Sequence, residues 1–104
     1  MSVLSVYATF ADADEAERIG RMVVEERLAA CINILGPISS TYRWQGQVHT
    51  ASEVAALFKT TADIADALIA RVAALHSYDV PCIVTWPIEK ISDAYGRWVE
   101  SSVG

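Results

Sequence analysis

The chain has 104 residues, of which 53% are hydrophobic and 20% charged, so a disordered chain is excluded and one domain over residues 1–104 is expected. Its formal net charge is −5, with 13 acidic against 8 basic side chains and no run of lysine and arginine. This balance excludes a nucleic-acid partner of the usual basic kind, because neutralising a row of phosphates needs clustered positive charge.

The first strand-like segment, residues 3–10, is rich in β-branched and aromatic side chains and carries no charge, which predicts a central strand. Asp12 and Glu15 follow at the spacing of a capping box, so we expect a helix to begin there. Ile19 and Val23 lie on one stripe of this helix, and charged residues occupy the other sides. The pattern predicts a helix that packs on a sheet.

A long hairpin is predicted next. Residues 28–34 form a strand that should be interrupted at residues 36–37, because the proline there cannot donate a ladder hydrogen bond. The strand resumes over residues 40–44, and residues 48–58 return it through the glycine-containing connection at 45–47. Arms of this length extend past a small domain and leave edge groups open to a neighbouring chain, so we expect an oligomer.

The last part of the chain predicts a helix, a strand and a short final helix. One of the threonines at residues 60–61 should cap the helix, which ends near His76. Residues 82–86 read as a strand, and Ser92 starts the last helix. The order βαββαβ followed by α predicts an α+β fold: a ferredoxin-like antiparallel sheet with helices on one face and an extra C-terminal helix.

Three sequence features bear on the cellular location: the N-terminal residues, the length of the apolar stretches and the two cysteines. The N-terminal residues have no basic segment and no small-residue cleavage site, so no secretory signal is expected. Apolar stretches such as residues 54–58 are far shorter than the ~20 residues that cross a bilayer, so no membrane partner is expected. Cys31 and Cys82 lie in apolar strand-like runs, which is typical of reduced, buried thiols. We therefore expect a cytoplasmic protein.

Five short motifs occur in a fixed order along the chain, at residues 26–33, 40–46, 53 with 58–60, 76–81 and 87–88. By sequence, order and spacing they resemble the CutA divalent-cation tolerance family over nearly the whole chain. The resemblance implies a homotrimer in which the long hairpins cross between subunits, related in architecture to the PII-like signalling trimers. It also implies a role in tolerance of copper (Cu²⁺) or another divalent metal, without enzymatic activity or an organic cofactor.

The chain departs from the family at positions linked to metal. The family member best associated with copper has a cysteine at the end of the first strand and paired histidines after the second helix. By resemblance, this chain has Ala8 in place of the cysteine and Leu75 and His76 in place of the histidines, so only His76 is kept. The family commonly has a glutamate just after the proline, in the place of Cys82. Because a thiol is a softer ligand than a carboxylate, the metal preference stays open.

His76 and Cys82 form the candidate soft-metal pair. His76 is placed either to ligate a metal through its neutral ring or to interact with the carbonyls at its helix end. Cys82 is either a ligand or a small buried hydrophobe. His49, near the hairpin tip, is expected to be solvated surface. No metal-ligand spacing occurs within the chain, so such a site would be completed by a neighbouring subunit.

A ligand cleft is the second candidate site. Glu53 and Lys59 are six residues apart, so their side chains should share one face of a strand, either in a cleft or as an interface ion pair. Trp44 and Tyr78 supply an aromatic wall or fill a subunit interface. The alternative to a weakly metal-binding trimer is thus a PII-like sensor or scaffold with a small anionic ligand at Lys59. An enzyme with Cys82 as nucleophile lacks any catalytic signature.

Overall fold

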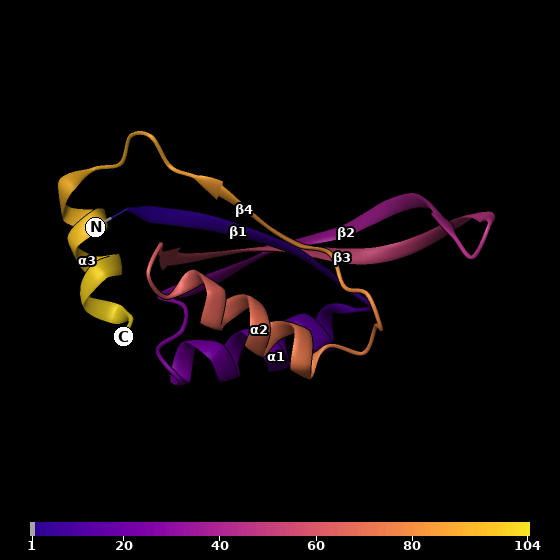
Figure 1. Ribbon diagram of the computed structural model, residues 1–104, viewed down its shortest axis with the longest axis horizontal. Helices are drawn as coiled ribbons and strands as arrows, with labels where there is room; N and C mark the ends of the chain where they lie inside the picture. Colours follow the sequence, from indigo (N-terminus) through magenta and orange to yellow (C-terminus); the bar gives the residue numbers. More distant parts are fainter. Residues whose placement is uncertain (1) are drawn as a thin grey trace.

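A four-stranded antiparallel sheet with helices on one face makes up residues 2–104, the part of the chain that the computed structural model describes. The elements in chain order are β1 (Val3–Phe10), α1 (Ala13–Glu25), β2 (Cys31–Trp44), β3 (Gln47–Thr61), α2 (Ala65–Leu75), β4 (Ile83–Pro87) and α3 (Asp93–Ser102). The strand order is β2-β3-β1-β4, and α1 and α2 lie beneath the sheet with α3 at one end (Figure 1). The predicted α+β, ferredoxin-like fold with an extra C-terminal helix is confirmed.

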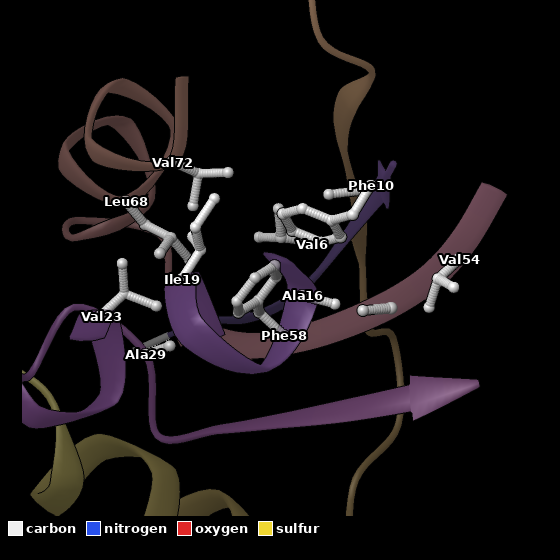
Figure 2. Packing of buried hydrophobic residues seen from close by; sticks show 12 residues of the cluster. Val6, Phe10, Ala16, Ile19, Val23, Ala29, Val54, Phe58, Leu68 and Val72 are labelled. Atoms are coloured by element: carbon white, nitrogen blue, oxygen red, sulfur yellow. The ribbon is translucent and has the colours of Figure 1, made fainter. Parts of the chain in front are cut away.

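The core fills the space between the sheet and the two long helices. Val6 and Phe10 of β1, Phe58 of β3, Ile19 of α1 and Leu68 of α2 are all 0% exposed and point toward one another in Figure 2. Because side chains alternate along a strand, the strand residues between these core residues point to the opposite face of the sheet. The described helices leave most of that second face uncovered.

The predicted cap of α1 is confirmed, with one difference in its hydrogen bonds. The Asp12 side chain accepts from the backbone N–H of Glu15 at 2.8 Å. The Glu15 carboxylate accepts from the N–H of Ala11 at 3.0 Å and from that of Ser77 at 2.9 Å. It therefore joins the β1–α1 turn to the segment after α2. Burial raises the pKa of Glu15, but its hydrogen bonds with Ser77 and Ala11, together with the nearby His76, lower it by more, so the net pKa lies below its usual value.

The break predicted at residues 36–37 is a β-bulge instead. β2 continues through this point, and its register against β3 shifts between Ile34 and Gly36, which leaves Leu35 as the extra residue. Gly36 has a φ of 107°, which favours glycine. Pro37 is tolerated because β2 is an edge strand of the sheet, where not every N–H is needed for the ladder.

The long hairpin is confirmed, and its outer half projects from the rest of the sheet. Gln45 and Gly46 both have positive φ, 51° and 79°, as the two central residues of a type I′ turn require. β1 pairs with residues 54–61 of β3, so within residues 2–104 the outer residues 47–53 have β2 as their strand partner (Figure 1). The arm therefore reaches past the helices that cover the sheet.

Three predicted boundaries were wrong. Thr60 and Thr61 do not cap α2: both are fully buried at the end of β3, where pairing with β1 holds them. The Thr60 hydroxyl donates to the carbonyl of Leu28 at 2.8 Å, and α2 begins only at Ala65. β2 begins at Cys31, and β4 begins one residue later than predicted. In each case the pairing of distant strands decided the boundary, which local sequence signals do not contain.

Candidate functional site

The uncovered side of the sheet, here called the bare face, is the face opposite α1 and α2. It carries Tyr7 on β1, Leu57 on β3 and Val84 on β4, which lie side by side in the sheet register. Val84 and Trp86 keep 45% and 48% of their surface exposed. The Trp86 ring packs on Tyr7 with a centroid distance of 5.4 Å. A surface this apolar is suited to contact with another molecule.

A cavity of about 720 Å³ opens at one end of the bare face, between the projecting hairpin, β1 and the segment after α2. Its lining includes three of the four predicted cleft residues, Trp44, Glu53 and Tyr78, together with Cys82. The fourth, Lys59, lies elsewhere. It shares the strand face with Glu53 as predicted, but it sits opposite Cys31, six residues along β3 and so about 20 Å away.

A hydrogen bond fixes the acidic group of the cavity. The Tyr78 hydroxyl donates to Oε2 of Glu53 at 2.9 Å. Burial, followed by the hydrogen bond and charge of Glu53, raises the pKa of Tyr78 to about 12. The phenol therefore stays protonated near neutral pH and remains the donor. Asp79 adds a second carboxyl group to the lining and Arg43 one guanidinium, so the charged side chains sum to one net negative charge.

His76 ends α2 and holds that end against β1. Its Nε2 lies 2.8 Å from the carbonyl oxygen of Thr9, and its Nδ1 lies 3.1 Å from the backbone N of Tyr78. Because a backbone N–H can only donate, Nδ1 is unprotonated and Nε2 carries the proton that Thr9 accepts. The ring also stacks on Phe10 at 5.1 Å. Both ring nitrogens have protein partners, so this conformation offers a metal no lone pair of His76.

Cys82 and Cys31 lie at opposite edges of the sheet, as predicted. Cys82 is exposed, so its prediction as a buried thiol was wrong: it stands beside an edge strand whose outer face nothing in residues 2–104 covers. Its carbonyl accepts from Thr9 N–H at 3.4 Å, while the Thr9 carbonyl faces His76. Cys31 is half-buried, with its Sγ 3.5 Å from the hydroxyl of Tyr95.

No complete metal site lies within residues 2–104, where no group of three or more histidine, cysteine, aspartate and glutamate side chains is placed to hold an ion. The soft donor that the cavity offers is Cys82, and the hard donors are Glu53 and Asp79. His49 stacks on Tyr42 near the hairpin tip at 5.7 Å and is exposed, as predicted. A metal held here would need ligands from a second chain.

The sequence did not single out Tyr7 and Tyr42, which also line the cavity. Both lie on the bare face. The parity of Tyr7 was visible in the sequence, but Tyr42 faces this side only because the bulge at Leu35 shifts the register of β2 by one residue. The sequence therefore predicted two of the four aromatic residues of the cavity, Trp44 and Tyr78, and missed the other two.

Comparison with known proteins identifies the family. The family model described as CutA1 divalent ion tolerance protein matches residues 4–102. The chain belongs to this family. It is 38% identical over 98 residues to the divalent-cation tolerance protein CutA of Archaeoglobus fulgidus, covering 94% of this chain and 95% of that protein. It is also 38% identical over 88 residues to the CutA homolog of Danio rerio, covering 85% of this chain and 59% of the relative.

Solved structures of the family have the same fold. CutA from Xylella fastidiosa superimposes with a TM-score of 0.96 at 36% identity, over 100% of both chains. The Archaeoglobus fulgidus structure, described as a periplasmic divalent cation tolerance protein, gives a TM-score of 0.94 at 36% identity over 98% of this chain and 99% of that chain. This chain thus spans the whole length of some relatives and little more than half of others. Residues 2–104 include no helix with the length and apolarity needed to cross a membrane.

Proposed function

We propose that the protein is a non-enzymatic homotrimer that serves divalent-cation tolerance by binding copper or a similar ion weakly where its subunits meet. The family supports the role in cation tolerance. The observation that carries the trimer is the bare face, with Val84 and Trp86 half exposed beside the edge strand β4. Monomeric soluble proteins rarely leave an apolar surface of this kind exposed to solvent.

Three features favour association of identical chains. The backbone edges of β2 and β4 are open in the four-stranded sheet, and open edges pair readily with other strands. The outer hairpin arm, residues 38–53, has no third strand beside it within residues 2–104. Burying apolar side chains stabilises by about 25 cal/mol per Å², which is a large gain for a chain of this size. The resemblance to CutA adds the expected number, three.

The metal site of this proposal centres on Cys82. Its thiol is exposed in the cavity beside Asp79 and Glu53, and a thiolate favours copper or zinc over magnesium or calcium. His76 would have to give up its hydrogen bond with Thr9 or Tyr78 before it could ligate. We therefore expect Cys82 to contribute more to affinity than His76, with a neighbouring subunit completing the coordination.

Metal titrations on matched variants test this assignment. Cu²⁺, and in parallel Zn²⁺ because it does not oxidise thiols, would be titrated against the wild type, Cys82→Ser, His76→Ala and the double variant. Cys82→Ser should weaken binding at least about tenfold and His76→Ala less. Cys31→Ser is the control, since the same change at the opposite sheet edge should leave the affinity unchanged. Equal affinities in the wild type and all variants would show that neither Cys82 nor His76 is a metal ligand.

The mass of the particle tests the trimer. Sedimentation velocity over a dilution series should give about three times the 11.3 kDa of one chain. A lone, stable 11.3 kDa particle at every practical concentration would contradict the proposal and every site shared between subunits.

A PII-like sensor or scaffold is the second candidate, favoured by the 720 Å³ cavity that gathers Trp44, Glu53 and Tyr78. Its anionic-ligand version depends on Lys59, which lies well away from the cavity along β3. A thermal-shift screen of nucleotides and carboxylates tests it, because a ligand that binds only the folded protein raises the midpoint of unfolding. A shift that Lys59→Gln abolishes would support this version, and no shift by any anion would oppose it.

We also propose a cytoplasmic location. Two free thiols at opposite edges of the sheet fit a reducing compartment, where disulfides do not form. The description of the Archaeoglobus fulgidus relative as periplasmic is the competing possibility. Fractionation of the source cells, with the protein found among periplasmic markers, would refute this location.

A further inference from the structure

The cavity on the bare face combines negative charge with aromatic side chains, and neither anion binding nor metal binding uses both. Four aromatic residues line it, Tyr7, Tyr42, Trp44 and Tyr78, and they come from β1, β2 and the segment after α2. We infer that this cavity binds a small organic cation, an ammonium or guanidinium group carried on an apolar body. The inference shares its cavity with the second candidate function and reverses the charge of the ligand.

The charges of the lining support a cation. Glu53 and Asp79 are acidic and Arg43 is basic, which leaves one net negative charge in a chain whose total charge is −5. Arg43 is exposed at the hairpin and free to extend toward solvent, whereas Glu53 and Tyr78 are half-buried. Because an interaction strengthens as water is excluded, the partly buried carboxylate dominates the field inside the cavity.

The carboxylate is also held in place before any ligand arrives. Tyr78 donates to Oε2 of Glu53, and the backbone N–H of Tyr78 donates to Nδ1 of His76, whose Nε2 in turn bonds Thr9 of β1. A carboxylate has about four acceptor sites, so acceptors remain for an ammonium or guanidinium beyond the one that Tyr78 uses. A group fixed in this way loses little conformational freedom on binding.

The aromatic walls suit the rest of such a ligand. An ammonium or guanidinium group within about 6 Å of a tyrosine or tryptophan face is attracted by the ring's negative quadrupole, and an apolar body gains by burial against the same rings. A hydrated divalent ion gains nothing from the apolar walls. An anion would meet the Glu53 carboxylate and the electron-rich ring faces together. The combination of walls and charge selects an organic cation.

A set of ligands that differ only in charge tests the inference on the wild-type chain. Phenethylammonium, 2-phenylethanol and 3-phenylpropionate have similar apolar bodies and carry charges of plus one, zero and minus one. Binding is measured by calorimetry or ligand-observed NMR with EDTA present, so that the result does not depend on a metal. We expect saturable binding of phenethylammonium, with affinity at least roughly tenfold above that of the alcohol and of the anion. Equal or tighter binding of 3-phenylpropionate, or no binding of phenethylammonium, would overturn the inference.

Charge-neutralising variants locate the binding. Glu53→Gln keeps an acceptor for Tyr78 and should weaken phenethylammonium binding roughly tenfold, whereas Arg43→Gln should strengthen it about two- to threefold. Glu25→Gln, at the end of α1 and outside the cavity, is the control and should change nothing. An unchanged affinity in Glu53→Gln would refute the assignment.

A measurement on the wild type covers the case in which Glu53→Gln does not fold. Rising ionic strength should weaken phenethylammonium binding and leave the alcohol unaffected, and equal salt responses would oppose the inference. Because every lining residue belongs to one chain, cation binding survives even if the protein proves monomeric or fails to bind copper. A failure of the metal proposal and a failure of this one are therefore separate results.

Discussion

On the helix side of the sheet Phe10, Phe58 and Leu68 are fully buried, whereas on the bare face Val84 and Trp86 remain about half exposed. The same strands supply both faces, since alternate residues of β1, β3 and β4 point to opposite sides. The two faces of one sheet therefore differ in how far they are buried within the chain. The helix side stabilises the chain by itself, and the bare face leaves apolar side chains exposed, which is the surface that the proposed trimer and the proposed ligand would use.

Removing a large side chain from the helix side should have the largest effect. Phe58 is 0% exposed and packs edge-on against Phe10 at 6.4 Å. Phe58→Ala removes this ring and leaves a cavity, so we expect the free energy of unfolding to fall by about 3–5 kcal/mol. Urea denaturation monitored by circular dichroism measures it.

Val84→Ala is the matched test on the bare face. Its side chain keeps 45% of its surface exposed, so at dilutions where the chain is monomeric the cost should stay below about 1 kcal/mol. If this change costs as much as Phe58→Ala at low concentration, the two faces do not differ as described.

Glu15 connects the two regions, and its effect should be intermediate. It is 6% exposed and ties the start of α1 to Ser77, next to the segment that walls the cavity. Glu15→Gln keeps the size but loses the charge on both hydrogen bonds, so the free energy of unfolding at neutral pH should fall by about 1–2 kcal/mol. Thermal and urea unfolding at several pH values give this difference.

The pH dependence has a definite sign. The folded-state pKa of Glu15 lies below its ordinary value of 4.5, so its contribution to stability is fully present above that pH and is lost as the pH falls through the folded pKa. The stability gap between the wild type and Glu15→Gln should therefore shrink in acid. Glu17→Gln, exposed on the same helix, should show almost no gap. A gap in Glu15→Gln that stays constant from neutral pH into acid would contradict the role given to its charge.

Much of the helix side could be predicted from sequence because its signals are local. The uncharged run of β1, the Asp12 cap and the Ile19 stripe each lie within a few residues and are all present in the structure. The errors lie where distant strands decide. Thr60 looked like a helix cap, but pairing of β3 with β1 and the bond to Leu28 keep it in the sheet.

The candidate site was predictable only in part for the same reason. Trp44, Glu53 and Tyr78 line one cavity because a bulge, a hairpin and a loop bring them together, and their spacing in the sequence does not show that they do. For Lys59 the strand parity was right, but parity does not measure distance along a strand. The engagement of both His76 nitrogens depends on the backbone of Thr9 and Tyr78, which no side-chain pattern reveals.

Trp86 should matter less to folding than Phe58 and more to association. Trp86 is 48% exposed and rests on Tyr7, so Trp86→Gln should lower the free energy of unfolding of the monomeric chain by about 1–2 kcal/mol, less than Phe58→Ala. The same change removes a large apolar side chain from the proposed contact between subunits, so the trimer should dissociate at a higher protein concentration than in the wild type. Sedimentation velocity across a concentration series measures this shift.

Trp98→Gln supplies the control, because Trp98 is 45% exposed but lies on α3, away from the bare face. If exposure alone governed association, both variants would weaken the trimer equally. If the bare face is the contact surface, Trp86→Gln weakens it and Trp98→Gln does not. An unchanged particle mass in Trp86→Gln at every concentration would move the contact elsewhere and leave the open edges of β2 and β4 as the surfaces that hold the chains together.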